Sequence, residues 1–110
     1  MAIQSALRQA AHVPLETARL CAAVLELAEV AAPLLNPSVI SDVMVGALLA
    51  QAALDSAALN VDVNLAAMTD ARVTEQLQRE LDQARSGSAE RLQRILDTAR
   101  SRLSKPVSKR

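Results

Sequence analysis

The 110-residue sequence contains no phenylalanine, tyrosine or tryptophan, although hydrophobic residues make up 51% of it. An aromatic side chain buries a large area in a core or an interface, so Leu, Val, Ile, Met and Ala must supply that area in smaller pieces. The chain has two glycines and four prolines, which are the residues that most often mark turns and loops. Because alanine, the strongest helix former, is abundant, the composition predicts an all-α fold.

Other absences narrow the function. Cys21 is the single cysteine, so no internal disulfide forms, and no cluster of residues has metal-ligand spacing. The formal net charge is zero, and no aromatic side chain is present on which a base could stack. Charged or polar residues interrupt the apolar runs before they reach bilayer length, and the N-terminus lacks a signal-peptide pattern. We expect a cytoplasmic protein with no metal, no tightly bound cofactor, no nucleic acid partner and no membrane partner.

Apolar spacing predicts three or four main helices. Residues 2–12 indicate a short helix or the end of a longer one, and Pro14 suits the first turn of the next helix. In that helix, apolar side chains at spacings of three and four predict a buried stripe of Leu15, Ala18, Cys21, Leu25 and Ala28. A second, adjacent stripe consists of Leu20, Val24, Leu27 and Ala31.

The next predicted helix begins with Ser41 or Asp42 as its cap and runs to about residue 60. Between residues 43 and 54 only Gln51 is strongly polar, and a helix so uniformly apolar is typical of the centre of a bundle. We therefore expect the following side chains to be buried together: Val45, Leu48, Leu49 and Leu54. Gly46 indicates that a neighbouring helix or a ligand approaches the backbone closely.

Thr69 or Asp70 caps the last helical region, and the Ser-Gly-Ser sequence at residues 86–88 predicts a break within it. We expect one helical domain over residues 1–103 and a flexible basic tail over residues 104–110. Because a small core without aromatics is modest, we expect the bundle to be completed by self-association, as a dimer or a larger homo-oligomer.

One stretch of the sequence is distinctive. Residues 35–42 read Leu-Asn-Pro-Ser-Val-Ile-Ser-Asp, residues 45–50 read Val-Gly-Ala-Leu-Leu-Ala, and residues 60–65 read Asn-Val-Asp-Val-Asn-Leu. This order closely resembles the cyclodeaminase/cyclohydrolase family of folate enzymes, whose pattern is approximately N-P-x-x-x-S-D-x-x-V-x-A-L-L-A…A-L-N-V-x-x-N-L. The resemblance extends over roughly residues 4–100 and matches the C-terminal half of the family domain, without its glycine-rich N-terminal half.

The resemblance implies a helical, commonly dimeric protein that acts on a tetrahydrofolate derivative. One branch of the family hydrolyses 5,10-methenyltetrahydrofolate to 10-formyltetrahydrofolate, and the other closes 5-formiminotetrahydrofolate to the methenyl form with loss of ammonia. By the same resemblance, Asp42 would be the catalytic proton carrier, and Ser41, Asn60 and Asn64 would bind the substrate.

The residues by themselves leave structural alternatives open. A carboxylate in the first turn of a helix, as predicted for Asp42, also satisfies free N–H groups as a cap. Asn60 and Asn64 are four residues apart and share a helix face, where their amides suit either a pterin edge or the end of the helix. The alternative function is a non-catalytic dimerisation or assembly module, or a truncated relic of such an enzyme. We expect the isolated chain to turn folate over poorly or not at all.

Overall fold

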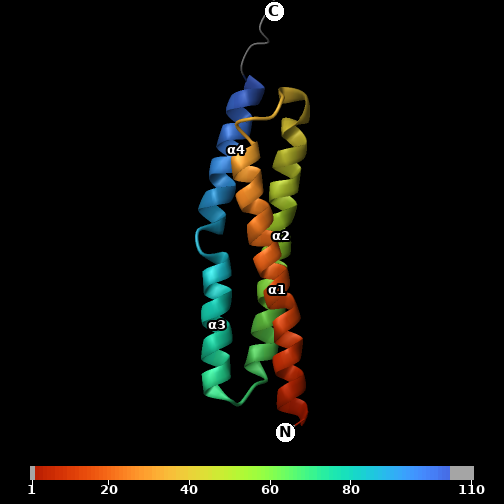
Figure 1. Ribbon diagram of the computed structural model, residues 1–110, viewed down its shortest axis with the longest axis vertical. Helices are drawn as coiled ribbons and strands as arrows, with labels where there is room; N and C mark the ends of the chain where they lie inside the picture. Colours follow the sequence, from red (N-terminus) through yellow and green to blue (C-terminus); the bar gives the residue numbers. More distant parts are fainter. Residues whose placement is uncertain (1, 105–110) are drawn as a thin grey trace, which may run out of the picture.

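The computed structural model describes residues 2–104, which form four α-helices: α1 (Ala2–Ala31), α2 (Pro37–Ala66), α3 (Ala71–Arg85) and α4 (Ser88–Ser104). α1 and α2 form a long antiparallel hairpin, and α3 and α4 follow one another along it as a third column (Figure 1). The described residues contain no strand, so the prediction of an all-α bundle is confirmed. The expected basic tail lies outside the described residues from position 105 onward.

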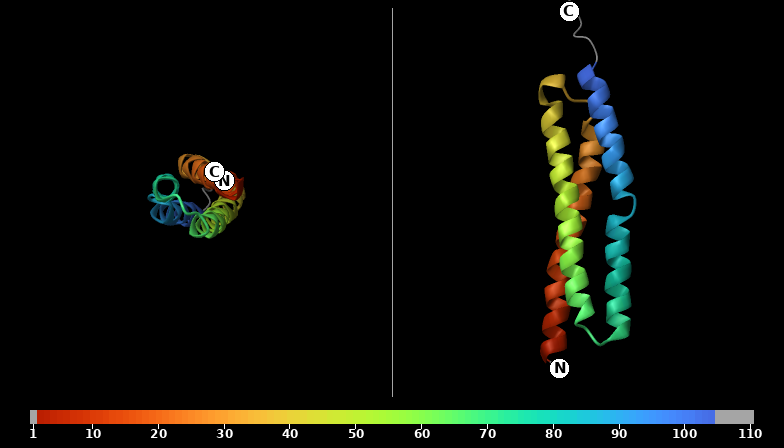
Figure 2. Two further views of the ribbon diagram at one scale, coloured as in Figure 1. Left: turned by 90° about the horizontal axis from the view of Figure 1, so that it is seen from below. Right: turned by 180° about the vertical axis from the view of Figure 1, so that it is seen from behind.

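The bundle is a thin rod, as the views along and behind it in Figure 2 show. Its extents are 70 × 17 × 15 Å and its radius of gyration is 17.9 Å, whereas a compact domain of this length has a radius of about 13 Å. A rod has much surface for its volume, so a large part of its apolar side chains cannot be enclosed by one copy of the chain.

α1 continues through Pro14, so the prediction that a helix starts there is wrong. Proline has no N–H, which leaves the carbonyl of the residue four positions earlier without its usual partner. That residue is Ala10, and Asn64 Nδ2 of α2 donates to its carbonyl oxygen at 3.5 Å. Ala11 and Leu15, on either side of the proline, are fully buried. Tertiary packing therefore maintains the helix across a residue that disfavours it.

α2 begins at Pro37, four residues before the predicted start. Asn36 occupies the cap position in an extended conformation and makes no side-chain capping bond, while Pro37 has the fixed φ that suits a first helical position. Ser41 and Asp42 consequently lie in the second turn, exposed to solvent. The prediction that either residue caps this helix is wrong, which removes the capping role as the reason for an acid at position 42.

The ends of α3 agree with the sequence. The Asp70 carboxylate caps α3 by accepting hydrogen bonds from the backbone N–H groups of Arg72, at 3.0 Å, and Val73, at 3.3 Å. α3 ends at the predicted break, where Gly87 has a φ of 72°, a left-handed conformation that glycine adopts without strain. Both predictions are confirmed.

The core lies between the hairpin and the α3–α4 column. The largest fully buried side chains come from all four helices: Leu15, Leu25, Ile40, Leu54, Val61, Leu81 and Ile95. The first predicted stripe of α1 is thus in the core, with Cys21 and Ala28 half-buried against it. The second stripe is not, because Leu20 and Leu27 are 68% and 70% exposed.

α2 contacts all three other helices but has one open side, so the expected joint burial of four of its side chains holds in a single chain for one of them only. Leu54 is fully buried, but Val45, Leu48 and Leu49 are 54%, 48% and 65% exposed. The reason is that α3 and α4 cover one side of the hairpin only. We call the uncovered side the α1·α2 outer face, and its large exposed apolar side chains are Val13, Leu20, Val24, Leu27, Leu34, Val45, Leu48, Leu49, Leu59 and Val63.

By length and composition alone, α2 could cross a membrane. Because one side of α2 is open, only 22% of its most apolar segment is buried. Polar and charged residues still interrupt the apolar run of α2, as the sequence indicated, so the absence of a membrane partner stays a prediction. α2 nevertheless contains Asp55 near its midpoint, ion-paired with Arg85 at 3.4 Å, and a carboxylate near a bilayer centre costs several kcal/mol. An apolar surface of this extent is typical of an interaction site.

α4 is fastened to the hairpin by arginines. Arg94 Nε donates to Glu29 Oε2 at 2.6 Å and Arg91 Nε donates to Glu29 Oε1 at 2.8 Å. Hydrogen bonds from Arg94 and Arg91 lower the pKa of the Glu29 carboxyl below its ordinary value of 4.5. Arg102 Nε donates to the Leu35 carbonyl oxygen at 3.0 Å, which satisfies a backbone acceptor in the turn between α1 and α2.

Candidate functional site

The hairpin carries a groove on its outer face that contains two of the four predicted site residues. The groove has a volume of about 490 Å³ and is open to solvent. Its lining is mostly apolar and comes from both helices: Ala10, Val13, Pro14, Thr17, Ala53, Ser56, Ala57, Asn60, Val63 and Asn64. An apolar floor with a few polar groups is the usual composition of a small-molecule site.

The two amides of the groove differ in which of their side-chain atoms are free to bind a ligand. Asn64 Nδ2 donates to the Asn60 carbonyl oxygen at 2.9 Å as well as to the Ala10 carbonyl oxygen, so its side-chain oxygen is the atom left for a ligand. The Asn60 side chain is exposed and makes no hydrogen bond with another described residue. Asn64 therefore has a structural role next to Pro14, and Asn60 offers a free donor and a free acceptor.

Asp42 and Ser41 lie far from the groove. Asp42 precedes Asn60 by eighteen residues, which is five helical turns, so the two side chains share a face of α2 but are separated by about 27 Å along its axis. Asp42 is exposed and forms no hydrogen bond or ion pair within the described part of the chain. The structure thus places the predicted residues on one surface but does not bring Asp42 and the two amides into one site within a single chain.

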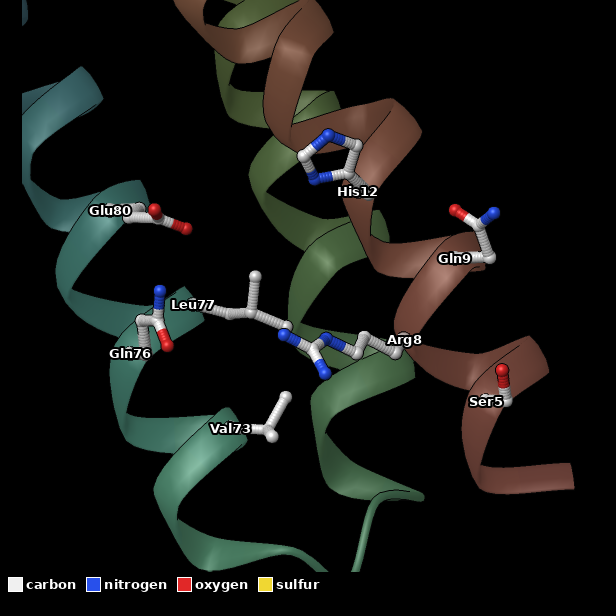
Figure 3. A pocket seen from close by; sticks show the side chains of 8 residues that line it. All are labelled: Ser5, Arg8, Gln9, His12, Val73, Gln76, Leu77 and Glu80. Carbon is white, nitrogen blue, oxygen red and sulfur yellow. The ribbon is translucent and has the colours of Figure 1, made fainter. Parts of the chain in front are cut away.

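A second hollow lies between α1 and α3, and the sequence reasoning missed it. Its volume is about 380 Å³, and polar side chains and two apolar ones line it: Ser5, Arg8, Gln9, His12, Val73, Gln76, Leu77 and Glu80. In Figure 3 the Arg8 guanidinium reaches into this hollow beside Val73 and Leu77, with His12 one turn further along α1. Neither Arg8 nor His12 has a hydrogen-bond or ion-pair partner among residues 2–104. The spacing of four residues between Arg8 and His12 was the available signal.

The hollow can hold an anionic group. Its one carboxylate, Glu80, already lies 3.6 Å from Arg19 Nη2, so the charge of Arg8 is not neutralised by it. Elsewhere in the described residues, no group of three His, Cys, Asp or Glu side chains is placed to hold a metal ion. The groove itself offers amide and hydroxyl groups on an apolar floor, and the guanidinium of Arg8 belongs to the hollow between α1 and α3.

These observations define a class of all-helical protein. Its α1·α2 hairpin bears an unpaired carboxylate and two amides on the outer face. Comparison of sequences identifies the family: the formiminotransferase-cyclodeaminase family matches residues 1–83. The chain belongs to this family. The match ends within α3, so α4 lies beyond it, and the resemblance is shorter than the expected residues 4–100.

A curated relative agrees with the family. The chain is 46% identical over 80 residues to a protein of Methylorubrum extorquens named methenyltetrahydrofolate cyclohydrolase. The aligned segment is 73% of this chain but 38% of the relative. The chain therefore spans well under half the length of that relative, and more than half of the relative has no counterpart here.

Proposed function

We propose that the chain carries the substrate-positioning face of a folate one-carbon enzyme that hydrolyses 5,10-methenyltetrahydrofolate to 10-formyltetrahydrofolate. The observation behind this proposal is the Asp42 carboxylate, which is exposed, unpaired and free of a capping role, on the same face of α2 as Asn60 and Asn64. The name of the Methylorubrum extorquens relative supports the same reaction.

The reaction adds water to the carbon that bridges N5 and N10 of the folate. The water oxygen bonds to that carbon, and one water proton passes to a base, for which Asp42 is the candidate. The bond between the carbon and N5 then breaks as N5 takes up a proton, and the remaining hydroxyl proton is released to solvent as the N10-formyl group forms. A positioned carboxylate contributes typically 10²–10⁴-fold to such proton transfers.

The amides would hold the pterin. Its lactam oxygen and amino group need a donor and an acceptor, which Asn60 supplies, while the side-chain oxygen of Asn64 is a further acceptor. Holding the ring would fix the bridging carbon relative to a base, which is the source of effective molarity in such sites. Because Asp42 lies about 27 Å from Asn60 along α2, the base and the amides that act on one substrate would have to come from different polypeptides. The folate carboxylates require a cation, which the lining of the groove does not contain. Arg8 lines the separate hollow between α1 and α3, so the cation must come from outside the groove.

Ring closure of 5-formiminotetrahydrofolate with loss of ammonia is the alternative reaction, since it passes through a tetrahedral carbon between the same two nitrogens. A non-catalytic assembly module is the alternative of a different class, and the large α1·α2 outer face favours it. Turnover separates the two classes, because an assembly module accelerates neither reaction above its spontaneous rate.

The test compares Asp42→Asn with Asp62→Asn, because both carboxylates are exposed on α2 and Asp62 lies on a different side of the helix. The loss of methenyltetrahydrofolate is followed by its near-ultraviolet absorbance, with the chain alone and with the unmatched remainder of the relative supplied as a second polypeptide. We expect at least a tenfold loss of rate for Asp42→Asn and no loss for Asp62→Asn. Equal rates for wild type and both variants would remove Asp42 from the chemistry, and no turnover in any sample would favour the assembly module.

A further inference from the structure

The hollow between α1 and α3 has the size and the composition of a small-molecule site, and the proposed function does not use it. Its volume of about 380 Å³ lies within the range of roughly 300–1,000 Å³ that is usual for such sites. None of its lining residues also lines the groove on the α1·α2 outer face. The two cavities are therefore separate and lie on different sides of α1. We call the second cavity the α1·α3 hollow.

The cationic group of the α1·α3 hollow is the Arg8 guanidinium. Arg8 makes no hydrogen bond or ion pair with another residue in the described part of the chain. Its guanidinium extends from α1 toward α3, beside Val73 and Leu77 (Figure 3). The N–H donors of a guanidinium form a planar fork that matches the two oxygens of a carboxylate. A ligand with a carboxylate would supply the partner that the described chain does not.

The anionic group of the hollow is the Glu80 carboxylate, which retains its capacity to accept hydrogen bonds. Its Oε1 atom lies 3.6 Å from Arg19 Nη2, which is too far for a hydrogen bond, and Arg19 donates a hydrogen bond to Glu16 instead. The Glu80 side chain is half-buried and faces the hollow from α3 (Figure 3). An ammonium group has three N–H donors and no acceptor, so it is the kind of group that this carboxylate would bind.

Val73 and Leu77 form an apolar floor beside the Arg8 guanidinium. Leu77 is buried and Val73 is half-buried. Glu80 follows Leu77 by three residues, so it lies about 4.5 Å further along the axis of α3. Hydrogen bonds between charged groups are about 2.7–2.9 Å long, and one at each end lets a molecule whose two charges are separated by a single carbon atom span this distance. An apolar substituent on that carbon would lie on the floor.

We propose that the α1·α3 hollow binds a small α-amino acid with an apolar side chain. The carboxylate of the amino acid pairs with Arg8, its ammonium group pairs with Glu80, and its side chain lies on Leu77. Because the ligand has one charge of each sign, it provides a partner for both side chains, whereas inorganic phosphate or a simple carboxylate would bring further negative charge next to Glu80. The site does not depend on the proposed function, since no residue of the folate groove takes part in it.

The test compares L-leucine with analogues that each lack one charged group: isocaproate has no ammonium group and isoamylamine has no carboxylate. Each is titrated into the isotope-labelled full chain, and the backbone amide signals of Arg8 and Leu77 are followed by nuclear magnetic resonance. We expect saturable shifts with leucine and at least tenfold weaker binding of both analogues. No shift with millimolar leucine, or equal binding of leucine and isocaproate, would overturn the proposal. So would tighter binding of inorganic phosphate, or of p-aminobenzoyl-L-glutamate, which would assign the hollow to the carboxylates of folate.

Two variants test the two contacts separately. Arg8→Ala should weaken leucine binding at least tenfold, and Glu80→Gln should remove the preference for leucine over isocaproate, because the ammonium group then has no carboxylate partner. The matched controls are Arg79→Ala and Glu75→Gln, which are exposed on α3 outside the lining of the hollow and should bind leucine as wild type does. A preference that survives in Glu80→Gln, or an equal loss of binding in the controls, would overturn the proposal. The comparison of the ligands on wild type remains decisive if a variant fails to fold by circular dichroism.

Discussion

Pro14 lies inside a 30-residue helix, and Asn64 supplies the hydrogen bond that the proline cannot make. In an uninterrupted helix, the N–H of residue 14 would donate to the Ala10 carbonyl oxygen. Here Asn64 Nδ2 donates to that oxygen from α2 at 3.5 Å. We predict that the effects of Pro14→Ala and Asn64→Ala on the free energy of unfolding are coupled, because either change alters the partner of the same carbonyl.

The magnitudes follow from the contacts. Pro14→Ala removes a residue that costs up to about 3 kcal/mol in a helix interior and restores the N–H, so it should be stabilising. Asn64→Ala removes a hydrogen bond worth about 1 kcal/mol, partly offset by a gain of about 0.5 kcal/mol in helix propensity. With alanine at position 14 the Ala10 carbonyl no longer needs Asn64, so Asn64→Ala should then be neutral or stabilising. The expected coupling is about 0.5–1 kcal/mol, since Ala10 is exposed and water can replace part of the lost bond.

The assay is urea unfolding followed by helical circular dichroism, at one fixed protein concentration because association would add to stability. With a slope of about 1.5 kcal/mol per molar urea, the coupling corresponds to a midpoint difference of roughly 0.5 M between the two backgrounds. Asn60→Ala is the matched control, because its amide does not contact Ala10, and its effect should be the same in both backgrounds. If Asn64→Ala costs the same with proline or alanine at position 14, the proposed compensation is refuted.

Three further predictions concern glycine and charge. Apart from the adjacent backbone of α2, no described atom lies within 4 Å of the place that a Cβ would take at Gly46. Gly46→Ala should therefore raise the free energy of unfolding by about 1 kcal/mol through helix propensity, and a loss of stability would contradict this. Gly87 has a φ of 72°, so Gly87→Ala should lower stability by about 1–2 kcal/mol, and an unchanged urea midpoint would contradict this. Arg94 and Arg91 lower the pKa of Glu29, so the stabilising contribution of its carboxylate is present at neutral pH and is lost as the pH falls below 4.5 through the lowered pKa. The free energy of unfolding of Glu29→Gln should therefore depend less on pH in that range. Identical pH profiles for wild type and variant would contradict the assignment.

Local signals in the sequence determined the helices and several of their ends. Asp70 caps α3 and Gly87 separates α3 from α4 as predicted, because a cap and a left-handed glycine act within a few residues of the chain. The stripe that contains Leu15 and Leu25 is buried as predicted, since a helix must pack one apolar face. The resemblance to the folate enzymes likewise depends on consecutive residues, and the comparisons confirm the family.

Contacts between distant residues decided the rest. The sequence could not show that α1 continues through Pro14, because the group that compensates it, Asn64, is fifty residues away. It gave no means to choose which of two apolar stripes is buried, because only the position of the α3–α4 column leaves Leu20 and Leu27 exposed. Nor could it reveal the distance between Asp42 and Asn60, because a motif records the order of residues and an unbroken α2 converts eighteen residues into about 27 Å. Sequence alone thus determined which residues are available to the site, and the tertiary structure decided that one copy of the chain does not bring them together.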